Sequence, residues 1–220
     1  MKESTVLKNE WCKYYDLTPL SPSKFYKIVG CYILGFEIIK IPNRGIAQPH
    51  LVVYPLWKDD IKQCLKTPYQ LYGLENKRGL QVKLSIAELL EERDIVFGLF
   101  DEYIGFDIKT SINSKELLKL IDKCDSGMYN NPWRLMHLSD AKIYQSAYLG
   151  DKNMFDRSIE ELTEIYLRIN KHIQLVESRY GDLNERRVFL QSLFDKREAI
   201  IDKVKVNAVN SKIKNYVELI

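Results

Sequence analysis

The sequence predicts an α+β fold, in which an N-terminal antiparallel sheet with flanking helices is followed by a long antiparallel helical hairpin. Over residues 1–150, segments rich in β-branched and aromatic residues alternate with turn residues and with short helical patterns. Over residues 151–220 the apolar spacing is helical. No repeat, low-complexity tract or proline-rich linker separates the two parts. We therefore expect a mixed α+β region, 1–150, with the hairpin, 151–220, packed on it as one compact unit.

Composition and charge place the chain among globular proteins. Of its 220 residues, 45% are hydrophobic and 29% are charged, with 33 basic and 30 acidic residues and a net charge of +3. Basic residues are interleaved with acidic ones, whereas proteins that bind nucleic acids or anionic membranes concentrate their basic residues in a patch. We therefore predict neither a nucleic-acid partner nor a membrane partner.

The sequence shows no targeting or cofactor signature. The first twelve residues lack the apolar block of a secretory signal, and the longest apolar run, 28–39, is shorter than the about 20 residues of a membrane span. The cysteines are far apart and match no zinc or redox motif; they are Cys12, Cys31, Cys64 and Cys124. These features predict a cytoplasmic protein with reduced thiols, without a metal and without another cofactor.

The first elements are predicted from caps and turn residues. Ser21-Pro22 combines a capping hydroxyl with a proline at the first helical position, which predicts a helix over 22–34. Strands are predicted at 36–41 and 50–57, as an antiparallel pair in which Pro55 favours an edge position.

Local signals define the elements that follow. A short helix is predicted at 59–66 and a hairpin from 69–75 and 80–84. Ser85 and Glu88 match a capping box that opens a helix ending at Gly105. The further expected elements are a strand at 106–112, a helix from Asn113 or Ser114 to Cys124, an irregular loop at 125–139, and a short helix from Ser139 to Leu149.

The strongest pattern is an apolar stripe in the C-terminal part. Its members are spaced alternately by four and three residues, which places them on one face of a single helix over 151–180. They are Phe155, Ile159, Leu162, Tyr166, Ile169, Ile173, Val176 and Tyr180. Gly181 ends this helix, and the following segment is expected to return as its antiparallel mate, with a break near 205–212. The stripe is interpreted as a layer packed on the fold; the alternative is a homodimer through the same stripe.

Catalytic motifs are absent from the sequence, including glycine-rich phosphate loops, GxSxG and HExxH. Of the three histidines, His137 falls in the expected loop 125–139, while His50 begins a strand and His172 flanks the stripe. Cys124 and His137 are the catalytic candidates, since a thiol beside a histidine base forms a nucleophile.

Aromatic and arginine residues outside the periodic patterns are candidates for a partner-binding surface, because these residue types dominate protein interfaces. Two groups qualify, one near the N-terminus and one in the loop 125–139. They are Trp11, Tyr14 and Tyr15, and Tyr129, Trp133 and Arg134. The alternative is that these side chains fix loops onto the core.

These observations favour a non-enzymatic intracellular protein that binds one protein partner. The concrete form of this hypothesis is an immunity or antitoxin-like protein that occludes its partner's active surface. The alternative is an enzyme, a hydrolase or transferase, whose site lies in the loop 125–139.

Overall fold

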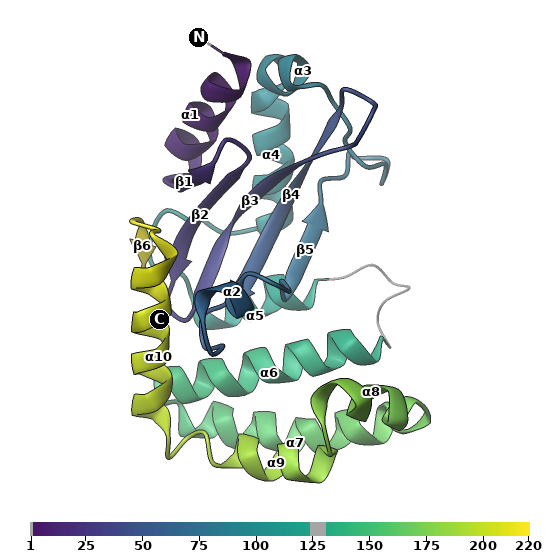
Figure 1. The fold of residues 1–220 in the computed structure, drawn as a ribbon, viewed down its shortest axis with the longest axis vertical. Coiled ribbons are helices and arrows are strands. Elements are labelled where there is room, and N and C mark those ends of the chain that lie inside the picture. The colour runs from purple at the N-terminus through teal and green to yellow at the C-terminus, as the bar shows by residue number, and fades with distance from the viewer. Residues whose placement is uncertain (1, 124–130) are drawn as a thin grey trace.

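The computed structural model describes residues 2–123 and 131–220, and it confirms the α+β class. An antiparallel sheet has the order β1-β2-β3-β4-β5, and β6 pairs in parallel with β2 on the side that also carries β1. Figure 1 shows the sheet above a group of helices. The strands are β1 (Thr18–Ser21), β2 (Lys24–Val29), β3 (Tyr32–Lys40), β4 (Ala47–Pro55), β5 (Gln70–Gly73) and β6 (Tyr216–Val217).

Helices α1 (Glu3–Tyr15), α3 (Ile86–Glu91) and α4 (Arg93–Ile104) cover one face of the sheet (Figure 1). Trp11 of α1 joins these layers, because its ring lies 5.1 Å from Phe36 of β3 and 5.1 Å from Phe97 of α4. The capping box at Ser85 is confirmed, and Gly105 ends α4 with φ 82°. Glu92 interrupts the predicted helix and divides it into α3 and α4.

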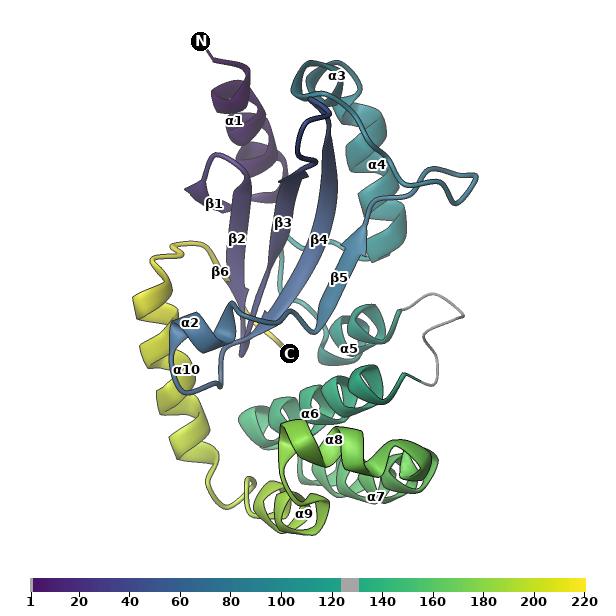
Figure 2. The same ribbon diagram turned by 45° about the vertical axis from the view of Figure 1, so that its right-hand side comes forward.

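The remaining helices lie toward the other end of the sheet (Figures 1 and 2). Asn113 caps α5 as predicted, and α10 runs beside α6 and α2. They are α2 (Ile61–Cys64), α5 (Ser114–Asp122), α6 (Pro132–Leu149), α7 (Lys152–Arg168), α8 (Ile173–Tyr180), α9 (Leu183–Gln191) and α10 (Arg197–Ser211). None of the helices in 2–123 and 131–220 has the length and apolar character needed to cross a membrane.

The helix predicted over 22–34 is wrong, because this segment forms the β2–β3 hairpin. Gly30 makes the turn with a φ of +54°, which favours glycine. Both strands are buried on their two faces over most of their length, so the polar alternation that marks a half-exposed strand is missing. An unbroken apolar run does not distinguish such a strand from a buried helix.

Three further local predictions are wrong. The strand that carries Pro55, β4, is not at an edge, because it pairs with β3 on one side and β5 on the other. Residues 106–112 form no strand, and only Ile112 makes an isolated bridge, to Leu219. Part of the expected loop 125–139 is helical, since α6 begins at Pro132, with the side chain of Asn131 accepting from the amides of Trp133 and Arg134. A proline at the first position is typical of a helix start.

The predicted helix over 151–180 is interrupted by a 3-10 turn, Asn170–His172, between α7 and α8. Helix α9 packs against α7 and α8, whereas α10 turns away to α6 and α2, so the hairpin is divided into shorter segments. Most of the stripe is nevertheless buried inside the chain, and only Ile173 is exposed. The stripe offers little free surface for the homodimer considered above.

Candidate functional site

Six polar and aromatic side chains meet where the sheet adjoins the C-terminal helices. We call them the junction cluster: Lys58, Tyr69, His137, Asp140, Tyr180 and Arg186. Lys58 follows β4 and Tyr69 precedes β5, whereas Tyr180 ends α8 and Arg186 lies in α9. His137 and Asp140 are three residues apart on α6 and therefore lie on the same face of this helix.

Asp140 lies at the centre of the junction cluster. Its Oδ2 accepts a hydrogen bond from the Tyr69 hydroxyl at 3.3 Å, and its Oδ1 forms an ion pair with Nη2 of Arg186. The side chains of Asp140 and Arg186 are only 3% and 16% exposed. Burial opposes the charge of Arg186, but the neighbouring carboxylate outweighs this effect and raises the pKa of Arg186. The pair therefore links α6 to α9. Removing one member of a buried ion pair typically costs about 3–5 kcal/mol of stability.

The ring of Tyr69 contacts both His137 and Lys58. His137 stacks on it with the ring centroids 4.9 Å apart and the planes 11° apart, and Lys58 Nζ lies 5.6 Å from its centroid. Burial, followed by the charge of Asp140, raises the pKa of Tyr69 well above its usual value. The Tyr69 hydroxyl is therefore a neutral hydrogen-bond donor at every physiological pH.

His137 is held in its neutral form. Burial lowers its pKa to about 4; the charge of Asp140 opposes this shift, and the charges of Lys58, Arg179 and Arg134 add to it. Neither ring nitrogen of His137 forms a hydrogen bond with a described residue, since its contact is the stack on Tyr69. Toward the described residues, one nitrogen of the neutral ring is therefore an unused donor and the other an unused acceptor.

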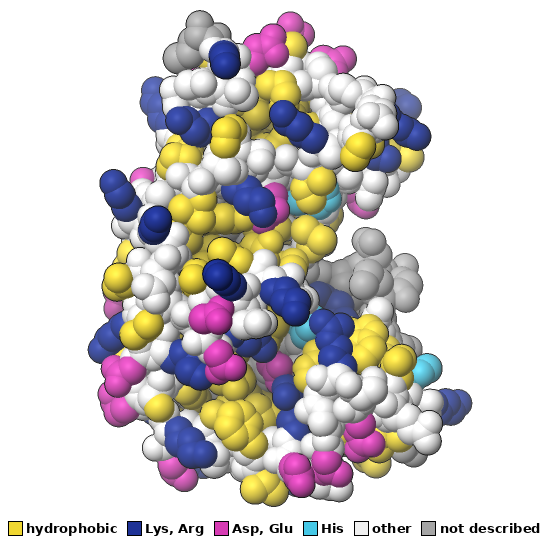
Figure 3. All heavy atoms as spheres, in the orientation of Figure 1, with side chains coloured by type: hydrophobic (Ala, Val, Ile, Leu, Met, Phe, Trp, Pro, Cys, Tyr) yellow, Lys and Arg dark blue, Asp and Glu magenta, His cyan; other side chains and the backbone are white. Residues whose placement is uncertain are grey.

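Positive charge exceeds negative charge around the junction cluster. Within the described residues, no carboxylate lies within ion-pair distance of Lys58 or of Arg179. Burial lowers the pKa of Lys58, with the charge of Asp140 opposing and that of Arg186 adding to this effect. Arg179 is exposed, with its guanidinium 5.1 Å from the Trp133 ring. Figure 3 shows several Lys and Arg side chains, with some Asp and Glu side chains among them, on the face that contains α2, α6 and α8.

The three partner-binding residues predicted in the loop 125–139 differ in their surroundings. Trp133 is half-buried and stacks on Tyr180 of the junction cluster, with the centroids 6.0 Å apart. Arg134 links the start of α6 to the end of α5, because its guanidinium donates hydrogen bonds to the carbonyls of Ile121 and Lys123. Tyr129 lies outside the described residues.

The predicted residues near the N-terminus belong mostly to the core. Trp11 and Tyr15 are each 1% exposed, which agrees with the alternative that these aromatics pack on the core and does not fit a contact surface. Tyr14 is 37% exposed, and its hydroxyl donates to Asp101 at 2.6 Å. Of the catalytic candidates, Cys124 lies outside the described residues, so its pairing with His137 stays a prediction.

The sequence patterns did not indicate the other members of the junction cluster, which are Lys58, Tyr69, Asp140, Tyr180 and Arg186. Only one signal was available, the His137 and Asp140 spacing, and it has meaning only once 132–149 is recognised as a helix. The other side chains come from distant segments: Tyr69 is 71 residues and Arg186 is 46 residues from Asp140 in the sequence. Across the described part of the chain, no three His, Cys, Asp or Glu side chains gather as metal ligands.

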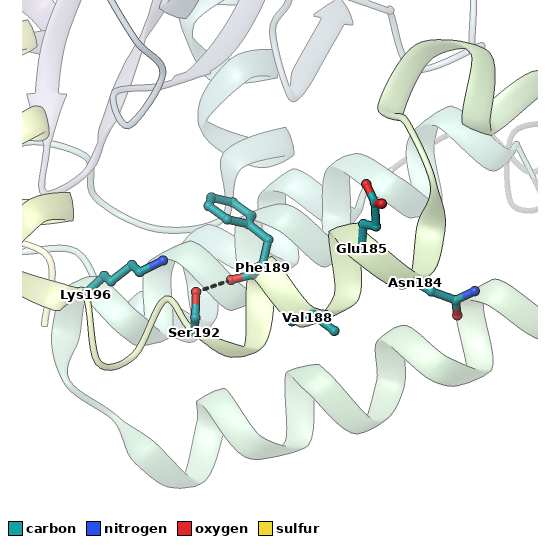
Figure 4. A pocket seen from close by; sticks show the side chains of 6 residues that line it. All are labelled: Asn184, Glu185, Val188, Phe189, Ser192 and Lys196. Atoms are coloured by element: carbon teal, nitrogen blue, oxygen red, sulfur yellow. Dashed lines mark hydrogen bonds between the residues drawn. The ribbon is translucent and has the colours of Figure 1, made fainter.

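A separate apolar depression of about 590 Å³ lies on α9 and the turn after it. Figure 4 shows that its lining side chains come from this single segment, with Glu185 and Lys196 toward its two ends. They are Asn184, Glu185, Val188, Phe189, Ser192 and Lys196. Because all six come from one continuous segment, α9 and the turn after it, the depression is a surface feature of this segment rather than a cleft between separate elements.

Comparison of this chain with protein-family models, with curated proteins and with solved structures gives no match.

Proposed function

We propose that this chain is a non-enzymatic binding protein that holds one protein partner at the junction cluster and at the adjoining Trp133 and Arg179. The observation that carries the proposal is the presence of two cations, Lys58 and Arg179, without a paired carboxylate among the described residues. Lys58 lies beside the buried Tyr69 ring, and Arg179 lies beside the half-buried Trp133 ring. Aromatic and arginine side chains are the types that contribute most to protein interfaces. The partner surface that complements them is acidic.

An immunity or antitoxin-like role is the concrete form of this proposal, in which the bound chain covers the active surface of its partner. The alternative is an enzyme, a hydrolase or transferase, and one observation favours keeping it: His137 is neutral and has no hydrogen-bonding partner among the described residues. A general base requires a group of this kind within reach of a substrate.

The test is co-purification of the tagged protein from its native host at low and moderate salt, with bound proteins identified by mass spectrometry. Two charge-reversed variants, Lys58→Glu and Arg179→Glu, are compared with the parent chain. Each is expected to retain at least about tenfold less of the partner, because charge reversal replaces attraction by repulsion.

A matched control is Lys40→Glu, which makes the same charge change elsewhere. Lys40 is exposed and pairs in the sheet with Ala47, at the opposite end of β4 from Lys58. Retention of the partner by this control and its loss from both junction variants is the expected result. Equal retention by all variants, or equal loss from all of them, contradicts the proposal.

A further inference from the structure

The junction cluster contains more hydrogen-bond donors than acceptors. Its only carboxylate, Asp140, already accepts from Tyr69 and Arg186. Nε of Arg186 is buried and has no partner among the described residues, and the ammonium of Lys58 has no paired carboxylate there. Because an ammonium and a guanidinium only donate, the missing complement is a group rich in acceptors.

Lys58 is fixed in place before any ligand binds. Asn207 of α10 is buried and donates through Nδ2 to the carbonyls of Leu56 and Lys58, at 2.8 Å each. These two bonds hold the chain as it leaves β4, and the side chain of Lys58 then extends toward the Tyr69 ring. A lysine whose main chain is held in this way loses less conformational freedom when it binds a ligand.

His137 reaches the same ring from α6. Its stack on Tyr69 fixes the plane of the imidazole, while Asp140, one turn further along α6, fixes the Tyr69 hydroxyl. A neutral imidazole provides one N–H donor without adding a charge to be compensated. Lys58 and His137 therefore both contact the buried ring of Tyr69, where they place an ammonium and an imidazole.

We propose that Lys58 and His137 form a subsite for a single oxyanion group, a carboxylate or a phosphate, with the exposed Arg179 at its edge. Charge-assisted hydrogen bonds to an oxyanion are stronger than those between neutral groups, and partial burial strengthens them further. A cationic group is disfavoured here because it would meet Lys58, Arg179 and Arg186. This inference rests on the proposed function, because the protein partner supplies the oxyanion group. The group is an acidic side chain or a phosphorylated residue of that partner.

The test uses the ring signals of the three histidines in two-dimensional NMR spectra of the full chain. Inorganic phosphate, acetate and a short glutamate peptide are titrated separately at pH 7 and constant ionic strength. A saturable shift of the His137 signals is expected, while His172, which is exposed, and His50, which bonds to the Gln48 carbonyl, report any general effect. Saturation by phosphate alone identifies a phosphate subsite, and saturation by acetate or the peptide identifies a carboxylate subsite.

Lys58→Gln is expected to weaken this binding at least about tenfold, the equivalent of one charge-assisted hydrogen bond. Arg179→Gln provides a second variant at an exposed position, with an expected weakening of about threefold, and Lys40→Gln is the matched control. Linear shifts of all three histidines, or saturation that is unchanged in both junction variants, overturn the subsite. If no protein partner co-purifies with the parent chain, while phosphate, acetate or the peptide still shows saturable binding at His137, the proposed function alone is overturned.

Discussion

The fold keeps His137 in its neutral form, and this has a consequence for stability. Its pKa is about 4 in the folded chain, below its usual value of 6.5, because it is buried. Between these two values an unfolded chain binds a proton that the folded chain does not bind. The stability associated with neutral His137 is therefore present above pH 6.5 and is lost as the pH falls toward 4, by up to about 3 kcal/mol.

His137→Phe keeps an aromatic ring against Tyr69 and removes the titration. We expect the free energy of unfolding of this variant to fall less than that of the parent chain between pH 6.5 and 4, when both are measured by chemical denaturation. The exposed His172, changed to Phe in the same way, is the matched control for the loss of a histidine. Parallel profiles of the parent chain and His137→Phe would show that the folded chain does not exclude this proton.

Among the elements, those whose ends depend on local chemistry could be predicted from the sequence. The capping box at Ser85, the cap at Asn113 and the glycine end of α4 need only neighbouring residues to form, and all three are present. The β2–β3 hairpin could not be predicted in this way, because Ser21-Pro22 is a good local helix start and the burial of both faces removes the strand signal. Tertiary packing overrides local preference here.

The candidate site could be predicted only in part. His137, Trp133 and Arg134 were selected from the sequence because they lie outside the periodic pattern, and they are close to or in the junction cluster. Their neighbours are Lys58 and Tyr69, from the segment between β4 and β5, and Arg186, from α9. These side chains meet α6 through tertiary contacts, which a single sequence does not reveal. The burial of Trp11 also depends on such packing, because its aromatic neighbours come from the sheet and α4.

Helix α7 provides a test of the apolar stripe. Leu162 lies in the middle of the stripe and is 0% exposed, whereas Leu167 lies on the same helix outside the stripe and is 74% exposed. Leu162→Ala is expected to lower the free energy of unfolding by about 2–5 kcal/mol, because it leaves a cavity in the core between α7 and its neighbours. Leu167→Ala, the matched control, is expected to change it by less than about 0.5 kcal/mol. Similar midpoints for both variants in urea would contradict the buried position of the stripe.

In the whole molecule, the last nine residues join parts of the fold that are far apart in the sequence. After α10, the carbonyl of Asn215 accepts from the amide of Ile28 at 2.8 Å, and that of Val217 accepts from Gly30 at 3.2 Å. The carbonyl of Glu218 then accepts from Ile112 at 2.9 Å, just before α5. One segment therefore ties the edge of the sheet to the helices beside it, near the C-terminus marked in Figure 2.

Leu219 is the apolar anchor of this segment. It is 5% exposed, and it packs so closely on the β2–β3 turn that a Cβ added at Gly30 would lie 2.6 Å from its own Cβ. Leu219→Ala is expected to destabilise the fold by about 2–5 kcal/mol. Because both sets of hydrogen bonds belong to the same segment, the amides of Gly30 and Ile112 are expected to lose protection from hydrogen exchange together. Ile220→Ala, at a neighbouring position that is 57% exposed, is expected to leave both amides protected. Loss of protection at only one of the two amides would mean that the sheet edge and the start of α5 open independently, and the C-terminal segment would then not couple them.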